Sequence, residues 1–314
     1  MEIKDFGRVG VLMGGPSSER GISLKSGKAV LSALKDSGVE ALGIDILTDN
    51  KEENIRLLNN CNLNCAFIAL HGRFGEDGQI QEILEQVGLP YTGSGVTASR
   101  LAMDKIGALR IFKAGRLCVP RSQSLDKTSY NKNRDFKNEL GLPLVVKPAN
   151  HGSSIGLSIV ELKQDLSAAI NLAFQFDERI VIEEYISGRE LTVGVLDEKP
   201  LPVIEIVPKH KFFDFEAKYQ AGLTDYIIPA PLKAEISEKV QQAALEAHKL
   251  LGCFGCSRTD IILNKDNLAF VLETNTIPGM TATSLLPKAA GILGIDFNQL
   301  CLKLLELAYE KEKV

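Results

Sequence analysis

The sequence has no excess of basic residues and no long hydrophobic run. Its 36 lysines and arginines are outnumbered by 40 aspartates and glutamates, which gives a formal net charge of −4. Proteins that bind nucleic acids usually carry a basic patch, so this balance argues against such a partner. No basic region precedes an apolar stretch in residues 1–6, and the apolar run Val9–Met13 is too short for a secretory signal or a membrane span. We therefore expect a cytosolic protein that acts on small molecules and not at a membrane.

Two common nucleotide-binding signatures are also absent. The glycine-rich segment Val9–Ser18 follows an apolar run but contains no GxGxxG, which argues against a dinucleotide-dependent oxidoreductase. No GxxxxGK[ST] motif occurs anywhere, so the chain has no P-loop. A nucleotide, if bound, must be held in another way.

The six cysteines permit a metal site or a disulfide but do not favour one. Cys61 lies close to Cys65 in the sequence, and Cys253 lies close to Cys256. The first spacing is loose for zinc and the CxxC motif stands alone. Cysteines of a cytosolic protein are usually reduced and buried as small apolar residues, and this is the interpretation we favour.

The order of hydrophobic segments predicts an α/β fold. At 314 residues, with 45% hydrophobic and 24% charged residues, the chain is long enough for two or three domains. An apolar run at 8–13, a glycine-rich turn at 14–18 and a helical pattern at 22–35 indicate strand, turn and helix. A second such unit covers 65–87, with a loop at 71–78. Alternating strands and helices imply a parallel sheet that carries its ligand loops at the strand ends.

The rest of the chain predicts two further pieces. A helix running from about 99–105 to 113 marks a boundary, and a small mixed sheet with one helix follows. The last piece has a polar, aromatic stretch at 209–226, a helix at 234–251, a hairpin and a terminal helix. The predicted domains are residues 1–102, 103–188 and 189–314.

The hairpin near the C-terminus is a candidate metal site. A four-residue turn at 264–267 would pair Leu263 with Leu268 and would place Arg258 opposite Glu273 and Asp260 opposite Val271. One face would then carry Arg258, Asp260, Glu273 and Asn275, and the core face Thr259, Ile261, Leu263, Leu268, Phe270 and Leu272. Two carboxylates and an amide oxygen suit Mg²⁺ shared with phosphates, although a solvated face with an Arg258–Glu273 ion pair is the simpler alternative.

Two other segments could hold a nucleotide. Lys147 ends a predicted strand and begins a loop rich in glycine and serine, Pro148–Ser158, whose backbone N–H groups could approach phosphates. The strand Ile180–Tyr185 breaks at a turn and restarts, which could expose backbone groups to an adenine ring. Taken locally, a flexible turn and a plain hairpin are the favoured interpretations of these residues.

Longer motifs occur in a fixed order along the chain: Gly14–Arg20, His71–Gly78, Pro90–Gly95, Met103–Lys105, Lys147–Ser158, Glu216–Tyr219 and Glu273–Thr281. Together they resemble the D-alanine–D-alanine ligases of the ATP-grasp superfamily, over about Val9 to Pro287. Arg189, Thr274 and Ile277 depart from residues common in that family, and none of the three is assigned chemistry.

The resemblance implies an ATP-grasp fold with an N-terminal parallel-sheet α/β domain, a small central domain and a C-terminal mixed-sheet domain. The middle and C-terminal pieces would hold ATP between two sheets while the N-terminal piece closes the amino-acid pocket. The residues implied for the nucleotide are Lys105 and Lys147 at the α- and β-phosphates, Ser153 and Ser154 above them, Glu183, Tyr185 and Ile186 around adenine, and Glu190 at the ribose. Asp260, Glu273 and Asn275 would bind two Mg²⁺ ions, with Mn²⁺ as an alternative.

The resemblance also implies the reaction, in which ATP drives the joining of two D-alanine molecules for peptidoglycan precursor synthesis. The γ-phosphoryl group would activate the first D-alanine as an acyl phosphate, which the amine of the second then attacks. The implied residues are Glu19 and His71 at the first amino group, Ser153 and Tyr219 connected to Glu19, Ser284 and Leu285 at the second carboxylate, Arg258 and the Gly279 N–H at the oxyanion, and Lys218 at the γ-phosphate. A homodimer is the family expectation, and a lid is expected around Phe212–Tyr226.

Two alternatives stay open within this resemblance. A regulatory homologue could bind nucleotide without catalysis, although it would be expected to lose a metal ligand or a phosphate lysine. A ligase could take D-lactate or D-serine as second substrate, whereas the Lys218–Tyr219 pair favours D-alanine. Singly, Glu19, His71 and Tyr219 also have structural explanations, as a surface pair, a helix cap and a packed loop residue.

Overall fold

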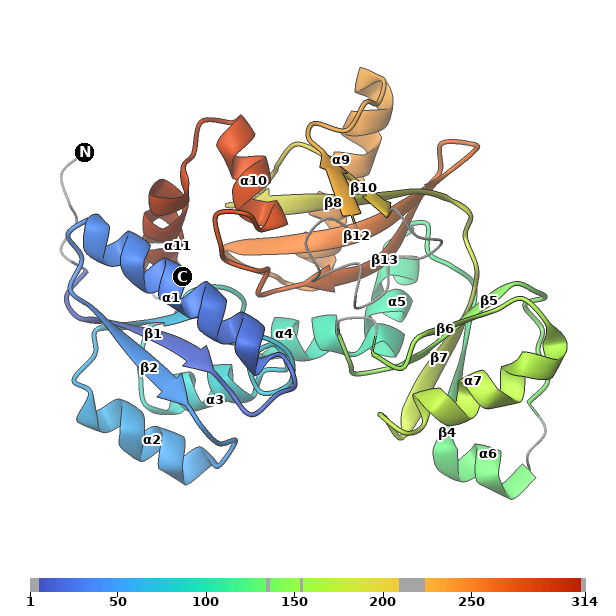
Figure 1. Cartoon of the computed structure of the whole chain (residues 1–314), viewed down its shortest axis with the longest axis horizontal. Helices are drawn as coiled ribbons and strands as arrows, with labels where there is room; N and C mark the ends of the chain where they lie inside the picture. Colours follow the sequence, from blue (N-terminus) through green and yellow to red (C-terminus); the bar gives the residue numbers. More distant parts are fainter. Residues whose placement is uncertain (1–5, 134–135, 153–154, 209–223, 312–314) are drawn as a thin grey trace.

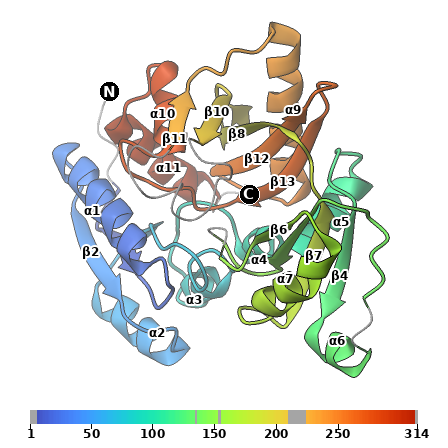
Figure 2. The same cartoon turned by 45° about the vertical axis from the view of Figure 1, so that its right-hand side comes forward.

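The computed structural model describes residues 6–133, 136–152, 155–208 and 224–311. In this part of the chain the strands form three sheets, and helices α4 (Val96–Met103) and α5 (Lys105–Ala114) lie between them (Figures 1 and 2). The predicted α/β class is confirmed. None of the helices in these ranges combines the length and apolar character needed to cross a bilayer.

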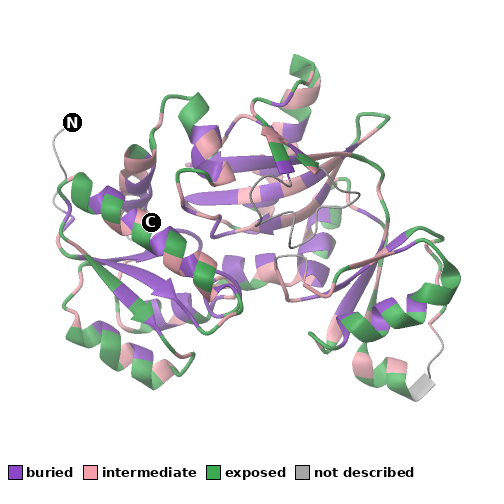
Figure 3. Cartoon of the chain, in the orientation of Figure 1, coloured by how far each residue is buried: buried purple, intermediate pink, exposed green. Residues whose placement is uncertain are grey.

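The first sheet is parallel, as its strand–helix alternation predicts. Strand β1 (Val9–Gly14) lies between β2 (Ala41–Ile46) and β3 (Cys65–Ile68), and every residue of β1 is buried (Figure 3). Strands of parallel sheets are covered on both faces, which explains the continuous apolar run. The helices of this unit are α1 (Arg20–Asp36), α2 (Lys51–Asn60) and α3 (Gln79–Gln86).

Different helices cover the two faces of this sheet, and the helices on one face come from both ends of the chain. Helices α2 and α3 pack on one face. The other face packs against α1 and against the last helix, α11 (Phe297–Lys311), with α10 (Leu285–Ile292) beside it. Tyr309 in α11 donates a hydrogen bond to the Phe6 carbonyl at 2.7 Å. The first strand and the last helix therefore share one hydrophobic core.

The central sheet is antiparallel and not mixed, so this detail of the prediction is wrong. Its order is β4-β7-β5-β6, and every pairing is antiparallel. Helix α7 connects β6 to β7, which run in the same direction, but β5 lies between them, so no adjacent pair is parallel. The elements are β4 (Ser122–Asp126), α6 (Lys127–Asn133), β5 (Leu144–Pro148), β6 (Ser158–Val160), a 3₁₀ turn (Lys163–Asp165), α7 (Leu166–Ala173) and β7 (Arg179–Glu184).

The third sheet has the order β11-β10-β8-β12-β13 and is also antiparallel where a mixed sheet was predicted. Short turns join β8 to β9 and β12 to β13, which forces antiparallel pairing. The elements are β8 (Gly188–Leu196), β9 (Lys199–Pro200), β10 (Ile204–Pro208), β11 (Thr224–Ile227), α9 (Ala234–Leu250), β12 (Cys256–Asn264) and β13 (Ala269–Asn275). The end of the expected lid segment is thus strand β11, and residues 209–223 lie outside the described ranges.

The β12–β13 hairpin has a different register from the predicted one. The loop is one residue shorter, because Asn264 pairs with Leu268 and Asn267 adopts a left-handed conformation. A bulge follows at Leu272, so that Asp260 lies opposite Glu273 and Arg258 opposite Asn275.

The two shifts have opposite effects on the predicted faces. Each shift moves the partner strand by one residue, so together they restore the polar face that carries Arg258, Asp260, Glu273 and Asn275. Between the turn and the bulge, the side chains of β13 lie on the face opposite to the predicted one. Val271 is buried, whereas Leu268 is 47% exposed and Phe270 and Leu272 are only partly buried, so the predicted core face is wrong at these three positions.

The cysteines follow the interpretation favoured from the sequence only in part. Cys65, Cys256 and Cys301 are buried, but Cys118 is exposed, and all six thiols are free. Burial raises the pKa of both Cys253 and Cys256 to about 12. Such thiols stay protonated near neutral pH and behave as small apolar groups.

Candidate active site

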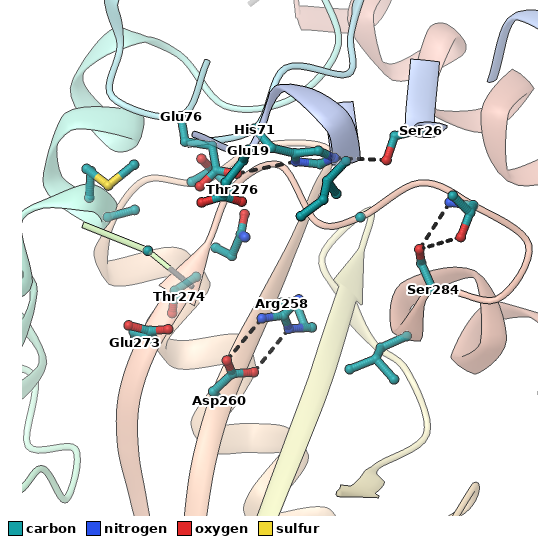
Figure 4. A pocket seen from close by; sticks show the side chains of 18 of the residues that line it. Glu19, Ser26, His71, Glu76, Arg258, Asp260, Glu273, Thr274, Thr276 and Ser284 are labelled. Carbon is teal, nitrogen blue, oxygen red and sulfur yellow. Dashed lines mark hydrogen bonds and ion pairs between the residues drawn. The ribbon is translucent and has the colours of Figure 1, made fainter. Parts of the chain in front are cut away.

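A cavity of about 360 Å³ lies where loops from the three sheets converge (Figure 4). It is lined by α1, the loop after β3, the start of α5, Gly152 in the loop after β5, and the polar face of the β12–β13 hairpin. The predicted site residues that line it are Glu19, His71, Lys105, Arg258, Asp260, Glu273, Asn275, Gly279, Ser284 and Leu285. Residues far apart in sequence therefore meet in one place.

One end of the cavity is formed by the carboxyl edge of the parallel sheet. Strand β1 ends at Gly14 with φ +85°, where a Cβ would overlap Asp45, and the chain then turns into α1 with Glu19 at its N-cap. His71 follows β3 and is almost fully buried. Both side chains lie at the same sheet edge because parallel strands end together. This end can take a small polar group such as an amino group.

Hydrogen bonds fix His71 on both sides. Its Nε2 lies 2.9 Å from Ser26 Oγ, its Nδ1 lies 3.4 Å from Glu76 Oε1, and its carbonyl accepts a bond of 2.6 Å from Ser17 Oγ (Figure 4). The ring orientation is therefore set by the protein before any ligand arrives.

The other end of the cavity is built from buried ion pairs. Lys105 Nζ donates to the His151 carbonyl at 2.6 Å and lies 3.4 Å from Glu273 Oε2. Lys147 lies behind the cavity, 3.0 Å from Glu183 Oε2, and both side chains are buried. Burial alone would lower the pKa of Lys147, but the Glu183 and Glu273 carboxylates outweigh it and raise the pKa. Lys105 at this end of the cavity, with Lys147 behind it, supplies the positive charge that a phosphate group would need.

The oxygen groups of the hairpin fit a hard divalent cation. Asp260 accepts from Arg258 Nε and Nη2, each at 3.0 Å, and from Thr192 Oγ1 at 2.7 Å. Among the residues that the structure describes, no three acidic, histidine or cysteine side chains gather as a metal site. An ion would therefore take Asp260, Glu273, the Asn275 amide oxygen and ligand oxygens, which is the donor chemistry that Mg²⁺ accepts when phosphates complete its shell.

The wall opposite these carboxylates is a loop leading into α10. Ser284 occupies the N-cap position of this helix, and its Oγ accepts from the Thr281 N–H at 3.1 Å. A Cβ on Gly279 would lie 3.1 Å from Ser284 Oγ, so glycine allows this close approach. The residues of this segment that line the space between the two ends are Gly279, Thr281, Thr283, Ser284 and Leu285.

Comparisons with known proteins agree on one family. Family models described as "D-ala D-ala ligase N-terminus" and "D-ala D-ala ligase C-terminus" match residues 47–94 and 111–306. A D-alanine–D-alanine ligase of Geotalea uraniireducens is 47% identical, over 96% of this chain and 95% of that protein. One of Nitrosomonas eutropha is 45% identical, over 99% of both chains. The chain belongs to the D-alanine–D-alanine ligase family.

Solved structures show the same relationship for the whole ligase. The crystal structure of the Bacillus anthracis D-alanine–D-alanine ligase complexed with ATP matches with a TM-score of 0.85 and 34% identity, covering 98% of each chain. The VanG D-Ala:D-Ser ligase of Enterococcus faecalis matches with a TM-score of 0.82 and 30% identity, covering 96% of this chain and 99% of that one. The fold of this ligase is the ATP-grasp fold.

Several predicted residues do not line the cavity of the ligase. Glu183 lies near the end of β7, Tyr185 and Ile186 connect β7 to β8, and Glu190 lies within β8. With Lys147, they form the region between the central and third sheets, beyond the cavity itself. Ser153, Ser154, Lys218 and Tyr219 lie outside the described residues.

The structure also adds residues to the cavity that the sequence did not single out. They include Lys25, Ser26, Glu76, Ile206 and Tyr226. Ser26 had a usable signal, because it lies two helical turns after Glu19 and therefore on the same face of α1. Tyr226 had none, since its strand β11 is short and carries alternating polar residues.

Proposed function

We propose that this ligase joins two molecules of D-alanine into D-alanyl-D-alanine at the expense of ATP. The observation that supports this best is the single cavity that combines Glu19 and His71 at one end with Lys105 and the Asp260–Glu273 pair at the other. An amino acid placed between them would have its amino group at the buried end and its carboxylate toward the phosphates. That orientation is the one required for activation of the carboxylate by the γ-phosphoryl group.

Positioning and charge neutralisation would carry the first step. Phosphoryl transfer needs little covalent chemistry from a protein, which agrees with a cavity that presents lysines and carboxylates but no activated nucleophile. Glu19 and His71 would hold the first D-alanine by its amino group. Lys105 and Lys147 would neutralise the phosphates. Asp260, Glu273 and Asn275 would hold Mg²⁺, which would supply further positive charge at the phosphate oxygens.

The second step would use the opposite wall of the cavity. Ser284 and Leu285 would contact the carboxylate of the second D-alanine and direct its amine at the acyl phosphate. Attack would produce a tetrahedral oxyanion, which Arg258 and the Gly279 N–H would stabilise. Collapse of that intermediate would expel phosphate and leave the peptide bond.

The test is ADP and phosphate formation by the purified protein with ATP and Mg²⁺, comparing D-alanine with L-alanine and identifying products by mass spectrometry. We expect D-alanyl-D-alanine and one phosphate per dipeptide. ATP binding without D-alanine-dependent turnover would instead support a regulatory homologue. Mixtures of D-alanine with D-serine or D-lactate test the second pocket, because the similarity to a D-Ala:D-Ser ligase makes that comparison necessary.

We further propose a homodimer in the cytoplasm and a division into units 1–102, 103–188 and 189–314. The use of ATP and the role of this family in peptidoglycan synthesis support the location. Light scattering coupled to size-exclusion chromatography tests the dimer, for which twice the 34.2 kDa chain mass is expected.

A further inference from the structure

Ser26 is a buried hydroxyl that none of the roles above uses. It lines the cavity and is 1% exposed. Its Oγ lies 2.9 Å from His71 Nε2 and accepts a hydrogen bond of 3.3 Å from the Met280 N–H. One side chain of α1 therefore touches the histidine after β3 and the loop that precedes α10.

Packing fixes the position of Ser26. Glu19, Ser23 and Ser26 follow one another at helical spacing on the same face of α1. Next to Ser26, Gly27 has no side chain, and a Cβ there would lie 2.4 Å from the Met13 side chain. Helix α1 can therefore lie directly on β1, and the Ser26 hydroxyl is held at a constant height above the sheet edge.

The hydroxyl can serve both neighbours at once. A serine hydroxyl has one donor and two acceptor positions. The Met280 N–H occupies one acceptor position, which leaves a donor and an acceptor for His71 Nε2. Ser26 can thus satisfy the imidazole whichever ring nitrogen carries the proton, while His71 Nδ1 faces Glu76 Oε1. Without the hydroxyl, two buried polar groups would lose a partner.

We propose that Ser26 is a positioning residue of the ligation reaction. It fixes the His71 ring, which holds the first D-alanine, and the Met280 N–H, which lies one peptide after the Gly279 N–H of the oxyanion site. The distance between the amino-acid site and the oxyanion site is then set by one hydroxyl. This inference rests on the proposed function, because it assigns Ser26 a part in that reaction.

The experiment compares Ser26→Ala, Ser26→Cys and Ser26→Thr with the control Ser23→Ala. Ser23 is equally buried on the same helix, donates to the Ala69 carbonyl at 2.7 Å and does not line the cavity. We expect Ser26→Ala to lower kcat about 10- to 100-fold, because two buried groups lose their partner in the reacting complex. KM for ATP should not change. Ser26→Cys should show an intermediate loss and Ser26→Thr should restore most activity, whereas Ser23→Ala should keep kcat.

A second readout does not depend on turnover. Hydrogen exchange at the Met280 amide should become about tenfold faster in Ser26→Ala and Ser26→Cys but not in Ser23→Ala. Only the two Ser26 variants lose the hydroxyl oxygen that accepts the hydrogen bond of this amide. If Ser26→Ala does not fold, the cysteine variant, which has nearly the same volume, decides. Wild-type kcat in Ser26→Ala and Ser26→Cys would overturn the inference. An equal loss of kcat in Ser23→Ala would also overturn it. A wild-type protein that forms no dipeptide would refute the proposed function, and Met280 exchange would still decide whether Ser26 holds the two segments.

Discussion

Different forces hold together the two ends of the cavity, which are the proposed amino-acid end at Glu19 and His71 and the proposed nucleotide end at Lys105. At the amino-acid end, the His71 ring is hydrogen-bonded to Ser26 and Glu76, and the His71 carbonyl accepts a hydrogen bond from Ser17. At the nucleotide end, Lys105 and Lys147 each lie within 3.4 Å of a carboxylate. One end is shaped by directional bonds, and the other by compensating charges.

This difference predicts different behaviour when substrates bind. The hydrogen-bonded end is organised before binding, so a substitution there should change substrate affinity and rate with little effect on the fold. The charged end must exchange partners when phosphates and a cation arrive, because Arg258 now holds Asp260 and Lys105 faces Glu273. A substitution there leaves an opposite charge without compensation, which costs stability as well as activity.

The largest effect is expected from Asp260→Asn, which removes a cation ligand and the partner of Arg258. We expect kcat/KM to fall about 10³-fold, since several kcat-determining interactions at the phosphates are lost together. The matched control is Asp266→Asn in the exposed turn of the same hairpin, which should retain full activity. Steady-state kinetics at saturating Mg²⁺ measures both, and similar rates for the two variants would contradict the assigned metal site.

The substitution Lys147→Met removes the buried ion pair between Lys147 and Glu183. We expect a loss of about 3–5 kcal/mol in the free energy of unfolding, because Glu183 stays behind as a buried unpaired charge. Urea denaturation measures this loss. The double variant Lys147→Met with Glu183→Leu should recover most of the stability but not the activity. Equal stability of the single and double variants would show that the pair does not act as a unit.

At the amino-acid end, Glu19→Gln should affect catalysis and leave the fold intact. We expect kcat/KM for D-alanine to fall about 100-fold, since a charge-assisted hydrogen bond to the substrate is replaced by a neutral one. The melting temperature should stay within about 2 °C, because glutamine keeps the size and shape of the buried glutamate. Glu52→Gln on the exposed face of α2 is the control. A large loss of stability in Glu19→Gln would contradict the expected difference between the two ends.

The smallest effect concerns a group outside the cavity. Burial lowers the pKa of His248 to about 4, although the Glu198 carboxylate acts in the opposite direction, and its Nδ1 lies 2.7 Å from Ser257 Oγ. The unfolded chain binds a proton near pH 6.5 and the folded chain does not, so stability falls as the pH drops from about 6.5 to 4.

We expect this residue to account for about 2 kcal/mol of the acid-induced loss. The difference in unfolding free energy between wild type and His248→Gln, measured at pH 7 and pH 4.5, isolates it. Parallel pH profiles for the two proteins would exclude His248 as the cause.

The sequence predicted the elements whose patterns are strong. The buried strands β1 and β3 and the amphipathic helices α1 and α9 were placed within a few residues. The strand β4 was missed because it is a polar strand at the sheet edge, and α2 was missed because its exposed face is dominated by charges. Local pattern cannot identify elements that bury little apolar surface.

The candidate site was predicted mainly through motifs and not through geometry. The hairpin shows why, because its predicted register was wrong while its polar face was right. A left-handed Asn267 shortened the loop, and the bulge at Leu272 then compensated. Both depend on backbone conformation, which hydrophobic periodicity does not report. The departure at Arg189 is likewise explained only by the structure, where its guanidinium pairs with both oxygens of Glu205 at 2.7 Å.

The shared core of β1 and α11 has a consequence for the order of assembly. During synthesis the first strands leave the ribosome long before residues 297–311, so one face of the first sheet lacks part of its cover until α11 has been made. Lys311, in the last turn of α11, also closes over the Tyr91 ring, 3.9 Å from its centre. The sheet whose edge carries Glu19 and His71 is therefore translated before one of the helices that cover it.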